Sequence, residues 1–368
     1  MLGTRLRATP VDGAALVLLV VACVYAWMKP MWDWDVIPYL ALAFHAQGLD
    51  WPAAHAAVYA WVAALPEPWS TDLLTRDVYR ASVAADAESL RQVGGFYQAR
   101  VGYYGLLAAL EYVGVTPAIA VQGINLVGQV VLGGTIWAWL RPYVRGVWWQ
   151  VGLWMLLYAV LLFNPTVMKL ARWSSPDGLV AALYVLGMYG VVRHRSPWAA
   201  AAWLVMVLLR PNTALWLAPV AMWAWWQARY MMWPLLGVGM VAVAIQWLFP
   251  NYPLSVVWQH TFGFPYTHPA EVHLAWTHDV YMATFKNRIG LLHGRDAVVW
   301  GLMAACTGLM WATQAPVRWL ATAVMAGACL QLAVFPAFWE RYFGGIAICL
   351  VLMALSALIK PKPYRAEP

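Results

Sequence analysis

The sequence predicts an all-α polytopic membrane protein with about ten transmembrane helices. Of its 368 residues, 63% are hydrophobic and only 11% are charged, and the mean hydropathy is +0.62. A soluble domain is roughly half apolar and about a quarter charged. A soluble fold of this length cannot hide so much apolar surface, so lipid must cover part of it. The 26 tryptophans fit the same prediction, because Trp favours the headgroup belts of a membrane.

Apolar runs that can span a bilayer recur along the whole chain. They cover residues 13–28, 117–140, 147–163, 177–192, 197–209, 213–227, 231–249, 297–313, 318–335 and 342–359. Arg5 and Arg7 precede the first run, and Trp27-Met28-Lys29-Pro30 stands where a signal peptide would have small residues for cleavage. We therefore interpret the first run as an uncleaved signal anchor.

The distribution of charge predicts the sidedness. With the N-terminus in the cytoplasm and the runs alternating, the inside holds eleven of the 23 basic residues and two of the 16 acidic ones, net +9. The outside is then net −2, which restores the +7 of the chain. Short, basic cytoplasmic loops follow the positive-inside rule, so the net charge needs no nucleic-acid partner. The inside residues are Arg5, Arg7, Arg141, Arg145, Arg193, Arg195, Arg229, Arg318, Lys360, Lys362, Arg365, Asp12 and Glu367.

Two outer segments remain, residues 29–116 and 250–296. Within the first, residues 36–47, 51–64 and 78–92 are predicted to be amphipathic helices that lie along the membrane surface. The apolar stretch 97–115 contains Arg100 and Glu111, and counting it as a span would turn the Arg-rich loops outward. We therefore expect it to be an interfacial or re-entrant helix on the outer face.

Some chemistries are not indicated. The cysteines Cys23, Cys306, Cys329 and Cys349 lie in apolar runs without paired spacing, which is typical of core residues rather than disulfides or metal ligands. The sequence has no Walker motif, no Gly-x-Gly-x-x-Gly after a strand and no Gly-x-Ser-x-Gly elbow. An activated donor held in the lipid fits better than a cytoplasmic nucleotide, and no cofactor is expected.

An acidic pair, Asp33 and Asp35, directly follows the first apolar run. One hypothesis is a general base or an acidic substrate clamp at the outer membrane face. The alternative is helix capping, because Asp35 precedes Pro38 and an Ala-rich run. Capping explains one carboxylate but not both.

Arg210-Pro211-Asn212 joins two short apolar runs. Each run reaches only about 20 Å at about 1.5 Å per residue, against a hydrocarbon core of about 30 Å. The turn should therefore lie below the outer membrane surface, where a buried cation is usually functional. A lipid phosphate is its natural ligand, and snorkelling to the headgroups is the alternative.

Two further outer turns carry charge. Asn164 to Gly178 includes Lys169 and Arg172, which are candidate phosphate ligands or snorkelling cations, and Asp177, which we interpret as a helix cap. At the start of the last run, Glu340 and Arg341 either pair with each other or bind a phosphate or sugar.

The loop 250–296 is rich in histidine. The spacing of five between His268, His273 and His278 matches no standard zinc motif, so a divalent metal is possible but not indicated. His268 is a candidate substrate-binding residue.

The order of these motifs resembles the GT-C superfamily of polyprenyl-phosphate-dependent glycosyltransferases, which includes protein O-mannosyltransferases and lipid A aminoarabinose transferases. The matching elements are Asp35-x-x-x-Tyr39-x-x-x-Ala43 ending at Gly48, Ser175-Pro-Asp177, Arg210-Pro211 and Arg341-Tyr342. They define a GT-C-like module of residues 1–229, with outer loop 29–116, followed by C-terminal helices 230–368. The sequence departs in having Asp-Trp-Asp instead of adjacent acids and in lacking a C-terminal soluble domain.

The resemblance implies an inverting sugar transfer from a polyprenyl-phosphate donor to the hydroxyl of a lipid, glycan or protein acceptor. Asp35 or Asp33 would be the base, and Arg210, Lys169, Arg172 and Arg341 would bind the donor phosphate. Arg100, Glu340, Tyr39, Asp177 and His268 would contact substrate. The expected location is a bacterial inner membrane, with both termini cytoplasmic and the active site periplasmic.

Two alternatives stay open at this point. One is a transporter or lipid flippase, although such proteins place ionisable groups near the bilayer midplane and often show repeated halves. The other is an O-antigen ligase or polymerase, which has a long outer loop late in the chain, as residues 250–296 do here.

Overall fold

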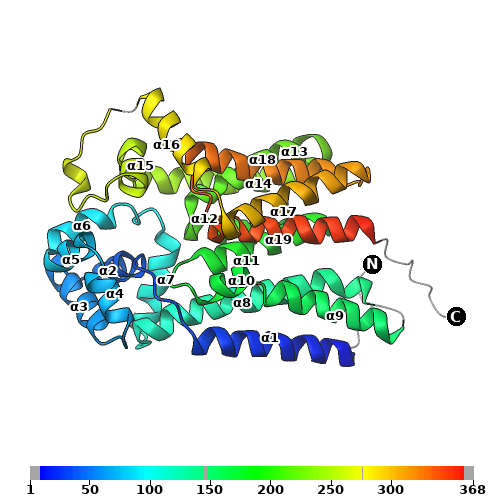
Figure 1. Ribbon diagram of the computed structural model, residues 1–368, viewed down its shortest axis with the longest axis horizontal. Helices are drawn as coiled ribbons and strands as arrows, with labels where there is room; N and C mark the ends of the chain where they lie inside the picture. Colours follow the sequence, from blue (N-terminus) through cyan, green and yellow to red (C-terminus); the bar gives the residue numbers. More distant parts are fainter. Residues whose placement is uncertain (1–8, 145–146, 276, 360–368) are drawn as a thin grey trace.

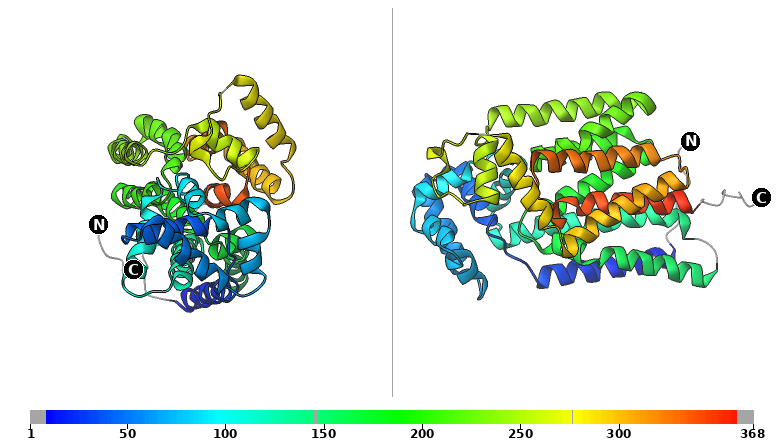
Figure 2. Two further views of the ribbon diagram at one scale, coloured as in Figure 1. Left: turned by 90° about the vertical axis from the view of Figure 1, so that its left-hand side faces the viewer. Right: turned by 45° about the horizontal axis from the view of Figure 1, so that its top comes forward.

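The structure is a computed structural model that describes residues 9–144, 147–275 and 277–359, and all the regular structure in these ranges is helical. Long helices lie side by side, and α1 begins at the end of the bundle where α19 finishes (Figure 1). Short helices gather at the opposite end, as the right view of Figure 2 shows. Several charged residues used to predict sidedness lie outside the described ranges: Arg5, Arg7, Arg145, Lys360, Lys362, Arg365 and Glu367.

Each apolar run of the sequence forms a helix. These bundle helices are α1 (Pro10–Met28), α8 (Pro117–Leu140), α9 (Trp148–Leu162), α11 (Asp177–Val192), α12 (Ser196–Leu209), α13 (Ala214–Gln227), α14 (Arg229–Leu248), α17 (Gly294–Ala312), α18 (Arg318–Val334) and α19 (Glu340–Leu358). Within the described ranges, α1, α8, α14 and α19 are long and apolar enough to cross a membrane alone. The pair α9 and α10 (Pro165–Arg172), bent by 49°, is a fifth candidate. The protein is thus an all-α chain with several helices suited to a membrane.

The outer layer consists of shorter helices. They are α2 (Val36–Ala46), α3 (Trp51–Ala63), α4 (Trp69–Thr75), α5 (Val78–Ala85), α6 (Ala87–Gly94), α7 (Val101–Tyr112), α15 (Leu254–Phe262) and α16 (His278–Gly290). The predicted helix 78–92 is divided at Asp86, whose carboxylate accepts the backbone N–H groups of Glu88 and Ser89 and so starts α6. The expected amphipathic character is wrong for α2, because an unbroken run from Val36 to Ala43 is buried. The 12-residue α7 is too short to span, as expected for an interfacial helix.

Small residues bring three bundle helices close together. A Cβ on Gly128 of α8 would lie 2.9 Å from the backbone nitrogen of Leu179 in α11. On the other side of α11, a Cβ on Gly345 of α19 would lie 2.9 Å from the Cα of Ala181. Such contacts let helix backbones approach closely. They hold the first turns of α11 and α19 next to each other at the end of the bundle that carries the short helices.

All four cysteines are free, in agreement with the absence of a predicted disulfide. Cys306 and Cys349 are buried, and Cys23 is half-buried. Cys329 is exposed on α18, so its assignment to the core is wrong.

Candidate active site

Two chain segments that are distant in sequence lie side by side at the end of the bundle that carries the short helices. The Met31 N–H donates to the carbonyl of Arg172 at 2.9 Å, and the Ser174 N–H donates to the carbonyl of Met31 at 3.0 Å. The Asp33 N–H also donates to the Ser174 hydroxyl at 2.6 Å. These bonds fix the residues after α1 against the turn between α10 and α11.

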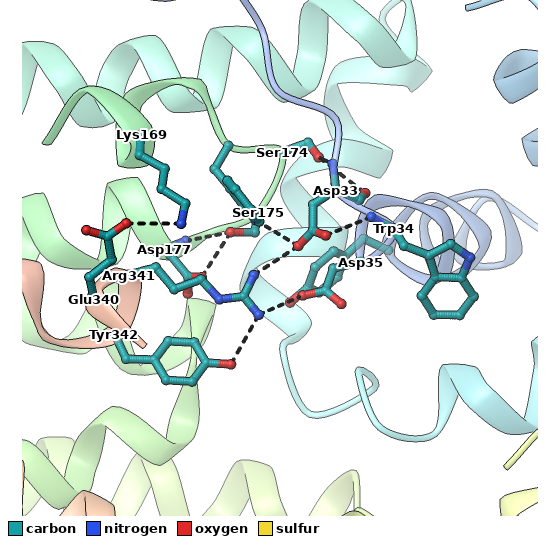
Figure 3. A network of polar contacts seen from close by, with 12 residues as sticks. Asp33, Trp34, Asp35, Lys169, Ser174, Ser175, Asp177, Glu340, Arg341 and Tyr342 are labelled. Atoms are coloured by element: carbon teal, nitrogen blue, oxygen red, sulfur yellow. Dashed lines mark hydrogen bonds and ion pairs between the residues drawn. The ribbon is translucent and has the colours of Figure 1, made fainter. Parts of the chain in front are cut away.

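Arg341, in the first turn of α19, connects the acidic residues (Figure 3). Its Nη1 lies 2.9 Å from Asp33 Oδ2, its Nη2 lies 3.7 Å from Asp35 Oδ2, and its Nε lies 3.8 Å from Asp177 Oδ2. One guanidinium therefore faces three carboxylates from two different segments, the stretch after α1 and the start of α11. A guanidinium offers five N–H donors in a fixed planar arrangement, which suits this role.

The two acids of the pair have different hydrogen bonds. Asp33 accepts three: from Arg341, from the Trp173 indole N–H at 2.7 Å and from the Trp34 backbone N–H at 2.9 Å. Asp35 Oδ1 accepts the Tyr97 hydroxyl at 2.7 Å, whereas Oδ2 has only its long contact with Arg341. Asp35 therefore keeps an oxygen free to accept another proton.

The capping alternative for the acidic pair is wrong. Asp35 occupies the N-cap position of α2, but its backbone is already helical and its side chain makes no capping bond. Both side chains stay accessible to solvent, with 20% of Asp33 and 25% of Asp35 exposed. The two carboxylates are thus largely buried but can still be reached by solvent.

The neighbouring charges shift the two acids in opposite directions. Burial, followed by the negative charge of Asp35, raises the pKa of Asp33 above its usual value, despite the opposing Arg341. Burial also opposes ionisation of Asp35, but Arg341 and Arg100 outweigh it and lower the pKa of Asp35. Asp35 is therefore ionised at neutral pH, as a base must be.

Asp177 and Arg210 form a buried ion pair. Arg210 Nη1 bonds to Asp177 Oδ1, and the two side chains are only 7% and 4% exposed. Arg210 also stacks on the Tyr342 ring, 4.1 Å from its centroid. The snorkelling alternative for Arg210 is therefore wrong. Asp177 is not the expected cap either, since Pro176 is the N-cap of α11.

Arg100 and Tyr39 lie next to the pair without touching it. Arg100 Nη1 donates to the Tyr39 hydroxyl, and its guanidinium lies 4.9 Å from the centroid of the Tyr97 ring. Because Tyr97 itself donates to Asp35, Arg100 acts on Asp35 through this aromatic contact and through its charge.

A second group of cations lines an open cleft of about 670 Å³ between α1, α9 and α10. Lys169, Arg172 and Arg295 provide its positive charge, and Val21, Phe163 and Met168 are among its apolar residues. Arg172 donates to the carbonyl of Lys29 and stacks on Tyr25, so it faces this cleft rather than Arg341.

Glu340 and Arg341 do not form the mutual pair that was considered as an alternative. Glu340 is buried and binds Lys169 at 3.0 Å and the Thr166 hydroxyl at 2.8 Å, while Arg341 turns toward the acids. The Trp173 ring contacts both cation groups, with Lys169 Nζ 4.7 Å and the Arg341 guanidinium 5.5 Å from its centroid.

His268 lies elsewhere. Its Nε2 is 3.3 Å from both Asp86 and Ser89 on α6. It thus links the 250–296 segment to the outer helices and has no contact with the acidic pair. Within the described residues, no group of three or more His, Cys, Asp and Glu side chains is arranged to hold a metal ion.

The sequence-predicted residues therefore form two neighbouring groups, with His268 apart from both. Three contributors were missed: Tyr97, Trp173 and Arg295. Trp173 sits inside a charged turn that the sequence already singled out, whereas nothing in the pattern marks Tyr97 as the partner of Asp35. Arg295 lies at the end of the loop 250–296, and no local pattern marks it as a neighbour of Lys169 and Arg172.

Comparisons of the chain with protein-family models, curated proteins and solved structures find no match in any of the three. The fold and the site thus define an all-helical protein suited to a membrane, with a cluster of acids and arginines at one end.

Proposed function

We propose that this protein is an inverting glycosyltransferase that moves a sugar from a polyprenyl-phosphate donor to an acceptor hydroxyl. In this proposal all ten bundle helices cross a bacterial inner membrane. Both termini are cytoplasmic, and the acidic cluster faces the periplasm. The shorter apolar helices α11, α12 and α18 cross as parts of this bundle.

The observation that carries the proposal is the adjacency of two chemically different groups. Asp35, an ionised carboxylate with a free oxygen, shares Arg341 with Asp33. Asp33 in turn accepts a hydrogen bond from Trp173, which lines an open cleft that combines three cations with apolar side chains. A phosphate attached to a long hydrocarbon tail needs this combination, with cations for the head and an apolar surface for the tail. The cleft opens along α1, whose outer side exposes Val17, Val20 and Val24.

The transfer is a single displacement. Asp35 Oδ2 takes the proton of the acceptor hydroxyl while that oxygen forms a bond to the anomeric carbon. The bond between this carbon and the phosphate oxygen breaks from the opposite face, and its electron pair leaves with the polyprenyl phosphate. Lys169, Arg172 and Arg295 stabilise the charge that develops there.

The remaining charges hold this arrangement in place. Arg341 keeps Asp33 and Asp35 together, and Arg210 neutralises Asp177, which would otherwise compete for Arg341. We therefore assign Arg210 to positioning and the cleft cations to the donor phosphate, in place of a direct phosphate contact by Arg210.

The test is incubation of the purified protein with a panel of polyprenyl-phosphate sugars and candidate acceptors. We expect release of polyprenyl phosphate that requires both substrates, with a product of inverted anomeric configuration. Release without an acceptor-derived product, or retention of configuration, would contradict the displacement. Movement of an intact donor across proteoliposomes would instead favour the transporter.

A further inference from the structure

An aromatic cluster lies against the acidic pair on the side away from the cation-lined cleft. Figure 3 shows Lys169 and the Trp34 indole on opposite sides of Asp33. The Trp34 ring packs on Tyr79 of α5 with 5.2 Å between centroids, and the Tyr79 hydroxyl lies 3.4 Å from His260 Nε2 of α15. We define the outer aromatic cluster as Trp34, Tyr59, Tyr79, Tyr97 and His260.

Two polar atoms of this cluster have no hydrogen-bond partner among the described residues. They are the indole nitrogen of Trp34, a side chain only 7% exposed, and the hydroxyl of Tyr59. Buried polar atoms in folded proteins are nearly always paired, so an unpaired one calls for an explanation such as a missing ligand. The Tyr59 hydroxyl is close enough to Tyr79 to act on it electrostatically. Burial raises the pKa of Tyr79 most, and Tyr59 and Asp35 raise it further.

The cluster carries no positive charge. The Tyr266 backbone N–H donates to His260 Nδ1 at 3.0 Å, which requires that nitrogen to be unprotonated. Burial also lowers the pKa of His260 to about 4. The imidazole is therefore neutral and presents an N–H at Nε2 toward Tyr79. The cluster thus offers flat rings and uncharged hydrogen-bonding groups beside one carboxylate.

These features match a sugar ring better than a peptide or a lipid. The C–H faces of a sugar pack on aromatic rings, while its hydroxyls bond to indole N–H and phenol groups. A lipid tail would leave the two unpaired atoms unsatisfied. A peptide strand would need an exposed sheet edge or a groove for its backbone, and the described part of the chain has no strand.

We propose that the outer aromatic cluster binds a saccharide that carries the acceptor hydroxyl. This assignment rests on the proposed function and names the class of its acceptor. The acceptor hydroxyl then attacks the anomeric carbon on the face opposite the donor phosphate, as inverting displacement requires. The acceptor proton goes to Asp35 Oδ2, because Tyr97 holds Oδ1.

The test measures saccharide binding by titration calorimetry of the full-length protein in detergent. The probes are trisaccharides of glucose, mannose and N-acetylglucosamine, beside serine- and threonine-containing hexapeptides. At least one trisaccharide should bind, and Tyr79→Ala should raise its Kd about tenfold or more. Tyr59→Phe removes only the unpaired hydroxyl and should raise Kd about threefold to tenfold.

The matched control is Tyr112→Ala, because Tyr112 is 84% exposed at the end of α7; its Kd should equal that of the wild type. Absence of trisaccharide binding, binding of the peptides instead, or an unchanged Kd in both Tyr59→Phe and Tyr79→Ala would overturn the assignment. Saccharide binding without release of polyprenyl phosphate would instead refute the proposed function and leave the saccharide site standing.

Discussion

At the scale of single residues, Arg341 is the cation that connects the three acids of the site. Removing one partner from a buried ion pair leaves an uncompensated charge, which costs about 3–5 kcal/mol. With Asp33, Asp35 and Asp177 all facing one guanidinium, a change at any of them redistributes Arg341 among the others. The acids are therefore expected to differ in what they contribute to stability.

Asp33→Asn should leave the protein at least as stable as the wild type near neutral pH. The raised pKa of Asp33 means that the folded state favours its protonated form. This preference stabilises the folded state below the ordinary carboxyl pKa, and the stabilisation is lost as the pH rises through the raised pKa of Asp33. An uncharged amide avoids this loss. Thermal unfolding in detergent across the pH range measures the effect, and a clear loss of stability at neutral pH would contradict it.

Asp35→Asn should have the opposite sign. The lowered pKa of Asp35 means that the folded state favours the carboxylate. Its stabilisation is present above the ordinary carboxyl pKa and is lost as the pH falls through the lowered value. The variant should be less stable than the wild type at neutral pH, because it lacks the carboxylate that the folded state favours. Equal stability of the variant and the wild type at neutral pH would refute this difference between the two acids.

At the scale of elements, the close approach of α11 and α19 determines where Asp177 and Arg341 meet. Gly345→Val places side-chain atoms against the Ala181 backbone and must push the helices apart. We expect the free energy of unfolding to fall by about 1–3 kcal/mol, as for overpacked cores. We also expect the transfer rate to fall by more than the loss of folded protein explains. The control is Gly301→Val on α17, where a Cβ meets nothing within 4 Å. Equal effects of the two substitutions on unfolding and on activity would show that this contact does not position the site.

The helices themselves could be predicted from the sequence, because apolar runs and prolines determine them locally. Each apolar run forms a helix, and the acids after the first run do lie with Arg210 and Arg341 near one end of the bundle. The backbone bonds between Met31 and residues 172–174 join segments about 140 residues apart, and no local pattern encodes them. For the same reason, no local pattern identified Tyr97 as the partner of Asp35. Asp177 resembled a helix cap because its true partner, Arg210, lies after another helix.

At the scale of the whole molecule, the account depends on which end of the bundle faces outward. Thr71 of α4 and Ala312 of α17 are exposed near opposite ends. In a background without the four native cysteines, an impermeant maleimide should label Thr71→Cys on intact cells and Ala312→Cys only after permeabilisation. The reverse pattern would place the acidic cluster in the cytoplasm and contradict the positive-inside prediction.

The most direct test of the central claim is release of polyprenyl phosphate by the Asp35→Asn variant. A lost general base lowers the rate by about 10²–10⁴-fold, so we expect a loss of this size in a protein that still folds. Asp279→Asn, which changes a fully exposed carboxylate on α16, should retain the wild-type rate. A wild-type rate in Asp35→Asn would contradict the assignment of Asp35 as the base.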